Sequence, residues 1–311
     1  LKKRDFPISI FPGLKKLSVK STSPVSTSSA SNTPSDMPFT PTMGVCQMNH
    51  AMRSGHEVPC HRGLMARIAI TGVCGLIGGI VHADLSASSH SLVGIDRPTD
   101  ERLARGRNVD DPNAPSRLDH ACDISQSSVE DLAEMFDGCQ YIIHLAADAD
   151  PSNWQMSMLE VNIGGTWKVI EAAKKASCKR IIIASSGLTQ VGLEGRVEPL
   201  IGVEHGVSID SPYGMTKIIG EVLGRSAAKV LEVICVRIGT VIPDDDEHKR
   251  RGGRLMATAF LQEDVRRFFR ACITSSIDGY LLTAAQSNSP TRFIDLEPGL
   301  SILNWNPVEW D

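Results

Sequence analysis

The sequence has no long hydrophobic run and no closely spaced cysteine pair. No apolar stretch reaches the roughly 18 residues that a membrane-spanning helix needs, so we expect no membrane partner. None of the eight cysteines forms a C-x-x-C pair, and several fall inside predicted strands or helices. We interpret them as reduced core thiols of an intracellular protein, and we expect no metal.

Acidic residues are scarce at the N-terminus and abundant in the rest of the chain. Residues 1–64 carry eight Lys/Arg and three Asp/Glu, whereas residues 65–311 carry 24 and 33. The acidic body argues against nucleic acid as a partner. Residues 21–42 are mostly Ser, Thr, Pro and Ala, a composition that cannot offset the entropy cost of ordering. We therefore interpret 1–64 as a disordered or leader extension of a cytoplasmic protein. Its basic, Ser-rich character leaves organelle import as the alternative.

The stretch 67–79 combines a short strand with glycines at regular spacing. Residues 67–71 are predicted to form a buried strand, and an apolar helix pattern begins inside the glycine motif. Such glycines allow a tight turn, close approach of a pyrophosphate and close helix packing. The helix N-terminus then offers free N–H groups to the phosphates. The residues expected to hold a dinucleotide here are Gly72, Gly75, Leu76, Ile77 and Gly78.

Two later strand ends carry acidic residues. Asp96 ends a predicted strand over 91–96 and follows Gly78 by 18 positions. A carboxylate there accepts hydrogen bonds from the adenosine ribose and repels a 2′-phosphate, which favours NAD over NADP. Arg97 could instead pair with that phosphate, so NADP stays the alternative. Asp123 and Ile124 follow a short strand over 118–122, in the position expected to lie near the adenine.

The rest of the chain alternates strands and helices. Residues 141–147 form a nearly continuous apolar run, typical of a central parallel strand, and we interpret His144 within it as a core histidine. The alternation predicts a Rossmann-type, doubly wound parallel sheet in an α/β fold. The further predicted strands are 179–186, 230–239 and 279–283, and the predicted helices are 128–137 (capped by Ser125 or Ser127), 152–177 and 257–273.

Tyr213 and Lys217 stand four residues apart on a predicted helix. This spacing places both side chains on one face. A cation beside a tyrosine favours the phenolate, so we expect Lys217 to lower the pKa of Tyr213. Ser186, at the end of a strand, can hold a substrate oxygen near the tyrosine.

Together these motifs resemble those of the extended short-chain dehydrogenase/reductases, the NAD-dependent epimerase/dehydratase family, over about 65–311. The resemblance implies that Tyr213 is the general base and that Ser186 orients the substrate. It implies that Lys217 tunes Tyr213 and binds the nicotinamide ribose, with Asn162 supporting the lysine through water. The motifs that carry it are Thr71–Gly78, Asp123-Ile124, His144–Ala147, Asn162, Ser185-Ser186 and Tyr213-x-x-x-Lys217. The remaining residues implied to line the NAD site are Leu145, Ala146, Ala147 and Ile238.

Within that family the C-terminal part resembles uronate dehydrogenase and its relatives. This resemblance implies that Thr240 and Gly187 contact a sugar and that Arg254 clamps its carboxylate. The chain departs from that pattern at Gly187-Leu188, where those enzymes have Asn-His, and at Ala149, where they have serine. A sugar phosphate or another aldose therefore stays open. The segments that carry the resemblance are 237–240, 254–264 and 303–307.

We therefore expect one NAD-binding Rossmann domain over 65–311, with a small substrate lobe formed mainly by 240–311. Its expected function is NAD-dependent oxidation of a sugar or sugar acid at a C1 hemiacetal or hydroxyl. Dehydration is disfavoured because no acid follows the serine strand at 187–189. A sugar epimerase and a non-catalytic dinucleotide-binding protein remain the alternatives, and homo-oligomerisation stays open.

Overall fold

The computed structural model describes residues 65–97, 116–242 and 252–310. All of them belong to one compact unit, Cys60–Asp311. The predicted leader, most of the loop after Arg97, and two of the eight cysteines lie outside the described residues. None of the described helices combines the length and the apolar character that crossing a bilayer requires.

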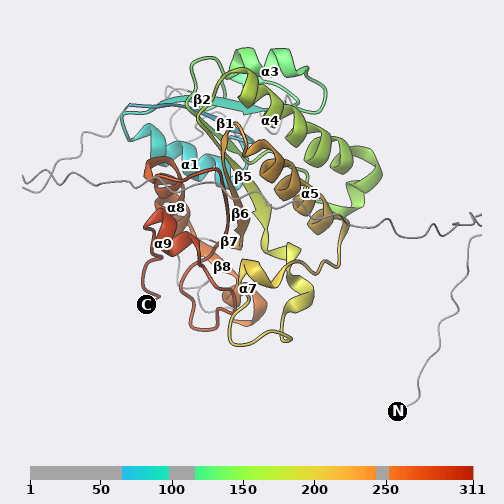
Figure 1. The fold of residues 1–311 in the computed structure, drawn as a ribbon, viewed down its shortest axis with the longest axis vertical. Helices are drawn as coiled ribbons and strands as arrows, with labels where there is room; N and C mark the ends of the chain where they lie inside the picture. Colours follow the sequence, from blue (N-terminus) through green and yellow to red (C-terminus); the bar gives the residue numbers. More distant parts are fainter. Residues whose placement is uncertain (1–64, 98–115, 243–251, 311) are drawn as a thin grey trace, which may run out of the picture. The chain divides into compact units, whose positions relative to one another are not determined.

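A seven-stranded sheet forms the centre of this unit (Figure 1). Its strand order is β3-β2-β1-β4-β5-β6-β9, and every neighbouring pair is parallel. The order reverses direction beside β1, which pairs with both β2 and β4. This confirms the predicted doubly wound sheet, whose ligand crevice is expected at that switch point. The strands are β1 (Arg67–Thr71), β2 (Ser91–Asp96), β3 (His120–Ala121), β4 (Tyr141–His144), β5 (Arg180–Ser186), β6 (Glu232–Ile238) and β9 (Tyr280–Ala285).

Helices cover both faces of the sheet, as buried parallel strands require (Figure 1). One layer holds α3, α4 and α5, and the other holds α1 and α8, which pack against each other. The bounds are α1 (Leu76–Ser86), α3 (Val129–Met135), α4 (Thr166–Lys175), α5 (Pro212–Ala227), α8 (Gln262–Thr274) and a short α9 (Gly299–Leu303).

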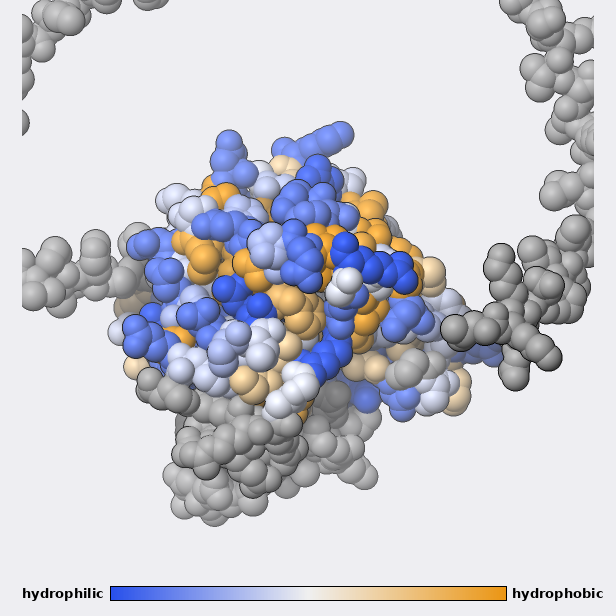
Figure 2. All heavy atoms as spheres, turned by 90° about the horizontal axis from the view of Figure 1, so that it is seen from below, coloured by the Kyte–Doolittle hydropathy of each residue, from blue (hydrophilic) through white to orange (hydrophobic). Residues whose placement is uncertain are grey.

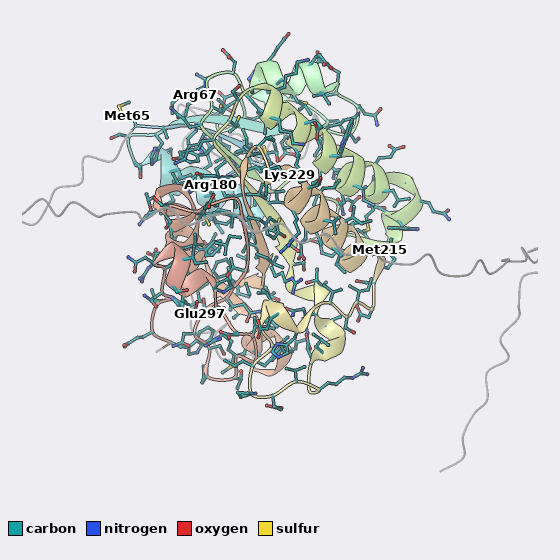
Figure 3. The ribbon with its side chains drawn as sticks, in the orientation of Figure 1. Met65, Arg67, Arg180, Met215, Lys229 and Glu297 are labelled. Carbon is teal, nitrogen blue, oxygen red and sulfur yellow. The ribbon has the colours of Figure 1, made fainter. Side chains whose placement is uncertain are left out.

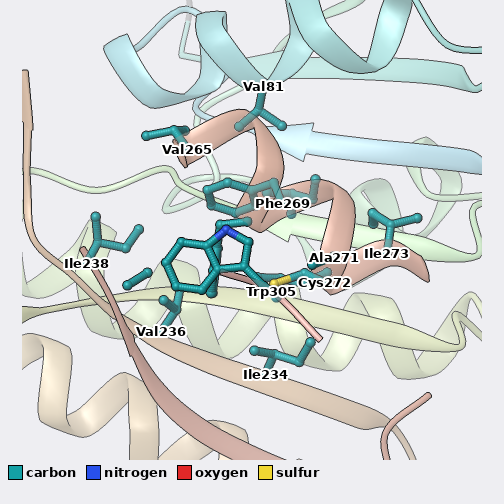
Figure 4. Close-up of a cluster of buried hydrophobic side chains, with 14 of the residues drawn as sticks. Val81, Ile234, Val236, Ile238, Val265, Phe269, Ala271, Cys272, Ile273 and Trp305 are labelled. Atoms are coloured by element: carbon teal, nitrogen blue, oxygen red, sulfur yellow. The ribbon is translucent and has the colours of Figure 1, made fainter. Parts of the chain in front are cut away.

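The strand alternation divides the core into two clusters. Ile68 and Ile70 of β1 pack in the cluster that includes α1 and α8, whereas Ala69 between them packs in the cluster that includes α3 and α4. Trp305, from the C-terminal segment, lies inside the first cluster (Figure 4). Its ring meets Phe268 edge-on, with centroids 5.0 Å apart. The C-terminal segment is thereby anchored against α8.

A small second sheet stands beside the main one. It pairs β7 (Thr240–Ile242) with β8 (Ala259–Leu261), and α7 (Gly253–Ala257) precedes β8. The predicted helix over 257–273 therefore starts late, at Gln262, because residues 259–261 take up strand pairing. Residues 240–311 also supply β9 to the main sheet.

Two further predictions needed correction. The predicted helix over 152–177 is continuous, but it opens with a 3₁₀ turn at Pro151–Asn153 and is π-helical over Trp154–Met158 and Glu160–Gly165, before α4. The cap of α3 is Ser128, not Ser125 or Ser127, and Ser128 forms a capping box with Asp131. Ser125 and Ser127 instead donate to Asp123.

Arg180 is the largest fully buried side chain (Figure 3). It pairs with Glu232 and donates to the carbonyl oxygens of Cys272 and Ser275 at the C-terminal end of α8. The six described cysteines are buried and free, as predicted. On the face shown in Figure 2, hydrophobic residues form patches between hydrophilic ones.

Candidate functional site

A cleft of about 340 Å³ opens at the carboxyl ends of the central strands. We call it the main cleft. Nearly every residue predicted to bind the cofactor lines it, and Asn162 is the exception. The predicted residues that line the cleft are Gly72, Gly75, Leu76, Ile77, Gly78, Asp96, Asp123, Ile124, Leu145, Ala146, Ala147, Ser186, Tyr213, Lys217 and Ile238.

The glycine loop has the shape that a phosphate cradle needs. Gly72 adopts φ +76°, and a Cβ there would lie 2.7 Å from the backbone nitrogen of Ala146. A Cβ on Gly78 would lie 2.2 Å from the Gly72 carbonyl oxygen, so only glycine lets α1 pack against the turn. The first residues of α1 line the cleft, and its free N–H groups point to an anion site.

Asp96 fixes this loop to the end of β2. Its Oδ2 atom accepts a hydrogen bond from the backbone N–H of Cys74, and its Oδ1 atom accepts one from the N–H of Arg97, both at 2.8 Å. The residue is only 5% exposed but lines the cleft. Its carboxylate is therefore held at the place where a ribose would be recognised.

Ser186, Tyr213 and Lys217 come together in the main cleft although they belong to two elements. Ser186 ends β5, and Tyr213 and Lys217 occupy the first two turns of α5, which begins with Ser211 as its cap. The Lys217 ammonium donates to the carbonyl oxygen of Ala184 at 2.9 Å and lies 5.4 Å from the centre of the Tyr213 ring. The Ser186 hydroxyl accepts from the N–H of Leu188, which leaves its own proton for a ligand.

The predicted lowering of the Tyr213 pKa is wrong for this structure. Burial raises the pKa of Tyr213 to about 12 and lowers the pKa of Lys217 to about 8. Both shifts have the same cause, because a buried site penalises the charged form of each group. Tyr213 therefore keeps its proton at neutral pH unless a ligand adds positive charge to the cleft.

Asn162 lies behind the cleft and is 3% exposed. Its side chain accepts from the N–H of Asp148 and donates to that residue's carbonyl oxygen, both at 2.7 Å. It also contacts the hydroxyl of Thr216, next to Lys217, at 3.1 Å. Asn162 thus ties the loop after β4 to the start of α5. Its predicted support of Lys217 through water stays a prediction.

A buried ion pair holds α5 against the sheet. Glu221 of α5 receives two hydrogen bonds from the guanidinium of Arg237 on β6, both at 2.9 Å. It also accepts a bond from the hydroxyl of Ser185, at 2.6 Å. Because Ser185 precedes Ser186, this network links the helix that carries Tyr213 to the strand that carries the serine.

His144 is a core residue, as predicted. Its Nδ1 lies 2.7 Å from the Thr71 hydroxyl and its Nε2 lies 3.0 Å from the Thr166 hydroxyl. Burial, followed by the charge of Lys217, lowers the pKa of His144 to about 3. The ring is neutral at physiological pH and joins β4 to β1 and α4.

A second cavity of about 160 Å³ adjoins the main cleft. We call it the side chamber. It shares Ser186, Ile238 and Gly239 with the main cleft. The three predicted substrate residues outside the main cleft, Gly187, Thr240 and Arg254, all line it. Sequence reasoning did not identify Glu194, Thr258 or Gln286, which also line the chamber.

Arg254 already has a partner at this chamber. Its Nε donates to both carboxylate oxygens of Glu194 at 3.0 Å, and its Nη2 donates to Oε1 at 2.7 Å. The Arg254 side chain is 44% exposed and the Glu194 side chain 24% exposed. The predicted contact of Arg254 with a substrate carboxylate stays a prediction. Glu194 would compete with that carboxylate for the Arg254 guanidinium.

Thr240 offers the chamber a hydrogen-bond acceptor. The hydroxyl of Thr258 donates to the carbonyl oxygen of Arg254, at 2.9 Å. The contact of 2.9 Å between the Thr240 and Thr258 hydroxyls must then use the Thr240 proton, because each hydroxyl has one. The free lone pair of Thr240 can accept from a ligand hydroxyl.

Comparisons with known proteins agree with this geometry. The chain is 29% identical to an L-arabinose 1-dehydrogenase (NAD(P)(+)) of Haloferax volcanii, covering 78% of this chain and 96% of that protein. It is 24% identical to an NAD-dependent glucose-6-phosphate dehydrogenase of the same organism, covering 68% and 84%. The crystal structure of uronate dehydrogenase from Agrobacterium tumefaciens superposes with a TM-score of 0.63 at 24% identity, covering 79% and 85%, and shares the fold.

A family model described as the NAD dependent epimerase/dehydratase family matches residues 68–264, which is more than half of the chain. This match spans the glycine loop, Asp96 and the Ser186, Tyr213 and Lys217 group. The chain therefore belongs to the NAD-dependent epimerase/dehydratase family.

Proposed function

We propose that this protein is an NAD-dependent sugar dehydrogenase that oxidises the C1 hemiacetal of an aldose or a sugar acid to a lactone. The observation that carries the proposal is the meeting of Ser186, Tyr213 and Lys217 in the main cleft, next to a side chamber. The named activities of the relatives, sugar oxidations with a nicotinamide cofactor, support it.

The main cleft fits NAD. The α1 N-terminus and its glycines would hold the pyrophosphate, and Asp96 would accept from the adenosine ribose hydroxyls. Asp123 and Ile124 would border the adenine. Lys217 would reach the nicotinamide ribose. Bound NAD would supply the hydride acceptor for C1 and the positive charge of a nicotinamide ring.

Residues of the chain accept and position the proton of the C1 hydroxyl. Tyr213 takes the proton of the C1 hydroxyl as the C1–H bond breaks and the C=O bond forms, so one hydride and one proton leave the sugar. Ser186 donates its free proton to the same oxygen and holds it beside the tyrosine. The Lys217 cation, 5.4 Å from the Tyr213 ring, stabilises the phenolate that the reaction requires.

A nucleotide-sugar epimerase would use the same three residues. The size of the side chamber disfavours it, because about 160 Å³ is small beside the ~300–1,000 Å³ of sites for drug-sized ligands. A monosaccharide suits such a chamber better than a nucleotide diphosphate sugar. An epimerase would also form no net NADH.

The test is a panel of aldoses, sugar phosphates and uronic acids incubated with NAD, and in parallel with NADP. We expect continuous NADH formation with at least one sugar, faster with NAD. Interconversion of sugar epimers without net NADH would support the epimerase. Tight NAD binding with no turnover on any sugar would indicate a non-catalytic binder.

A further inference from the structure

Gln286 has an unusual position at the side chamber. It directly follows β9, whose carboxyl end lies beside that of β6, at the edge where ligands of such sheets bind. Its side chain is 1% exposed and lines the chamber. The residue is therefore almost completely buried at the wall of a cavity.

The Gln286 amide lacks the partners that buried amides normally have. Its Oε1 atom is buried without a hydrogen bond, and no described residue bonds to either end of the amide. Gln190, a comparably buried glutamine 2% exposed, donates instead to the carbonyl oxygens of Gly202 and Gly206. Most buried polar groups are paired, and leaving one unpaired is costly. An amide offers both a donor and an acceptor, the combination that pairs with sugar hydroxyls.

The charge of the chamber points to the same kind of ligand. Among the described residues that line it, Arg254 and Glu194 are the charged ones, and they neutralise each other. The Glu194 carboxylate would repel a carboxylate or phosphate that approached Arg254. An uncharged sugar meets no such repulsion. The names of the relatives include a neutral sugar, a sugar phosphate and a uronate, so they do not determine whether the substrate of this chain is charged.

We propose that the side chamber selects an uncharged aldose, and that Gln286 determines this specificity by pairing with the sugar hydroxyls while Glu194 holds Arg254. The proposal rests on the proposed dehydrogenase function and names its substrate class. Thr240 complements the amide with an acceptor. Gln286 acts on sugar binding and orientation, whereas Tyr213 and Lys217 act on the reacting hydroxyl.

The first experiment compares sugars that differ only at C5. D-galactose, D-galacturonate and L-arabinose form one such series, and D-glucose, D-glucuronate and D-xylose form another. We expect kcat/KM with NAD to be about tenfold or more higher for a neutral member than for the uronate of its series. Preference for the uronate overturns the proposal but leaves the dehydrogenase function intact. No NADH from any sugar overturns both.

The second experiment removes the charge of Glu194. Glu194→Gln keeps the shape but frees the Arg254 cation, so the ratio of kcat/KM for the uronate to kcat/KM for the neutral sugar should rise by about tenfold. An unchanged ratio of the two sugars contradicts the role given to this pair.

The third experiment tests Gln286 with Gln286→Leu, and Gln190→Leu serves as the matched control. Gln286→Leu should lower kcat/KM for the neutral sugar on the order of 10- to 100-fold, with unchanged NAD affinity and an unchanged or higher melting temperature. Gln190→Leu should lower the melting temperature and leave the sugar KM within about twofold below that temperature.

The protein should also discriminate against one monodeoxy analogue of its sugar, and Gln286→Leu should lose that discrimination. Full activity and full discrimination in Gln286→Leu overturn the proposal.

Discussion

The ammonium group of Lys217 lies 5.4 Å from the centre of the Tyr213 ring while it donates a hydrogen bond to the carbonyl oxygen of Ala184. The strand β5 thereby fixes the cation that serves the tyrosine on α5. Burial raises the pKa of Tyr213 to about 12 and lowers that of Lys217 to about 8, so at neutral pH Lys217 stays mostly charged while Tyr213 stays neutral until ligands enter. Ionisation of Tyr213 is therefore expected after ligands bind and before the tyrosine accepts the hydroxyl proton.

Tyr213→Phe should abolish most turnover and leave NAD binding intact, because it removes the proton acceptor but keeps the ring. We expect kcat to fall on the order of 10²- to 10⁴-fold. Tyr280→Phe is the control, since the Tyr280 hydroxyl donates to the carbonyl oxygen of Glu221 and also contacts the thiol of Cys235, and Tyr280 does not line the main cleft. Steady-state kinetics and NAD titration check both variants. Normal turnover in Tyr213→Phe would refute the assigned base.

Asp96→Asn should narrow the preference for NAD over NADP. The amide oxygen can still accept from the N–H of Cys74 and so keep the glycine loop anchored, whereas the bond to the N–H of Arg97 and the charge that repels a 2′-phosphate are lost. A charge-assisted bond to the ribose also weakens, which should reduce NAD affinity by about tenfold. Titration with both cofactors measures the change, and equal affinities in the unmutated protein would contradict the role of Asp96.

His144 should make the fold sensitive to acid. Its folded pKa of about 3 lies below the ordinary value of 6.5, so the unfolded chain binds the extra proton between these values. The contribution of this residue to stability is present above pH 6.5 and is lost as the pH falls towards 3. Between pH 7 and 5 the unmutated protein should lose about 2 kcal/mol of unfolding free energy relative to His144→Gln. Denaturant titrations at both pH values test this, and parallel losses in the two proteins would contradict it.

Arg180→Met should destabilise the fold without affecting the chemistry. It would leave Glu232 and the carbonyl oxygens at the end of α8 without their donor, which should cost about 3 kcal/mol of unfolding free energy. Lys174→Met, which breaks the partly exposed pair with Glu171, is the control and should cost less than about 1 kcal/mol. Urea unfolding compares them, and equal stabilities would contradict the role of Arg180.

Local sequence signals predicted the main cleft well. Glycine spacing, an acid at the end of β2 and a Tyr–Lys pair four residues apart are short-range patterns. Such patterns determine the local backbone shape and the helix face independently of the tertiary contacts of the chain. The parallel sheet then brings the strand ends to one edge, so Asp96, Ser186 and Tyr213 meet in one cleft.

The side chamber was harder to predict, because its residues meet only through tertiary contacts. Glu194 precedes Arg254 by 60 positions, and a glutamate in this part of the sequence would by itself be interpreted as a solvated surface residue. Gln286 did carry a signal, since it is a polar residue directly after the apolar strand β9. The predicted end of that strand at residue 283 placed Gln286 in a loop. The pKa of Tyr213 is set by the burial of its side chain. The sequence shows that Lys217 is nearby but does not show how deeply Tyr213 is buried.

The most direct test of the central claim follows the hydrogen atom at C1. The protein is incubated with NAD and a C1-deuterated sugar from the panel, and the reduced cofactor and the sugar product are examined by NMR and mass spectrometry. The proposed dehydrogenase predicts one deuterium in each NADH formed, an equal amount of lactone or its hydrolysis product, and many turnovers per protein molecule. NADH without deuterium, or a sugar epimer with no accumulated NADH, would contradict oxidation at C1.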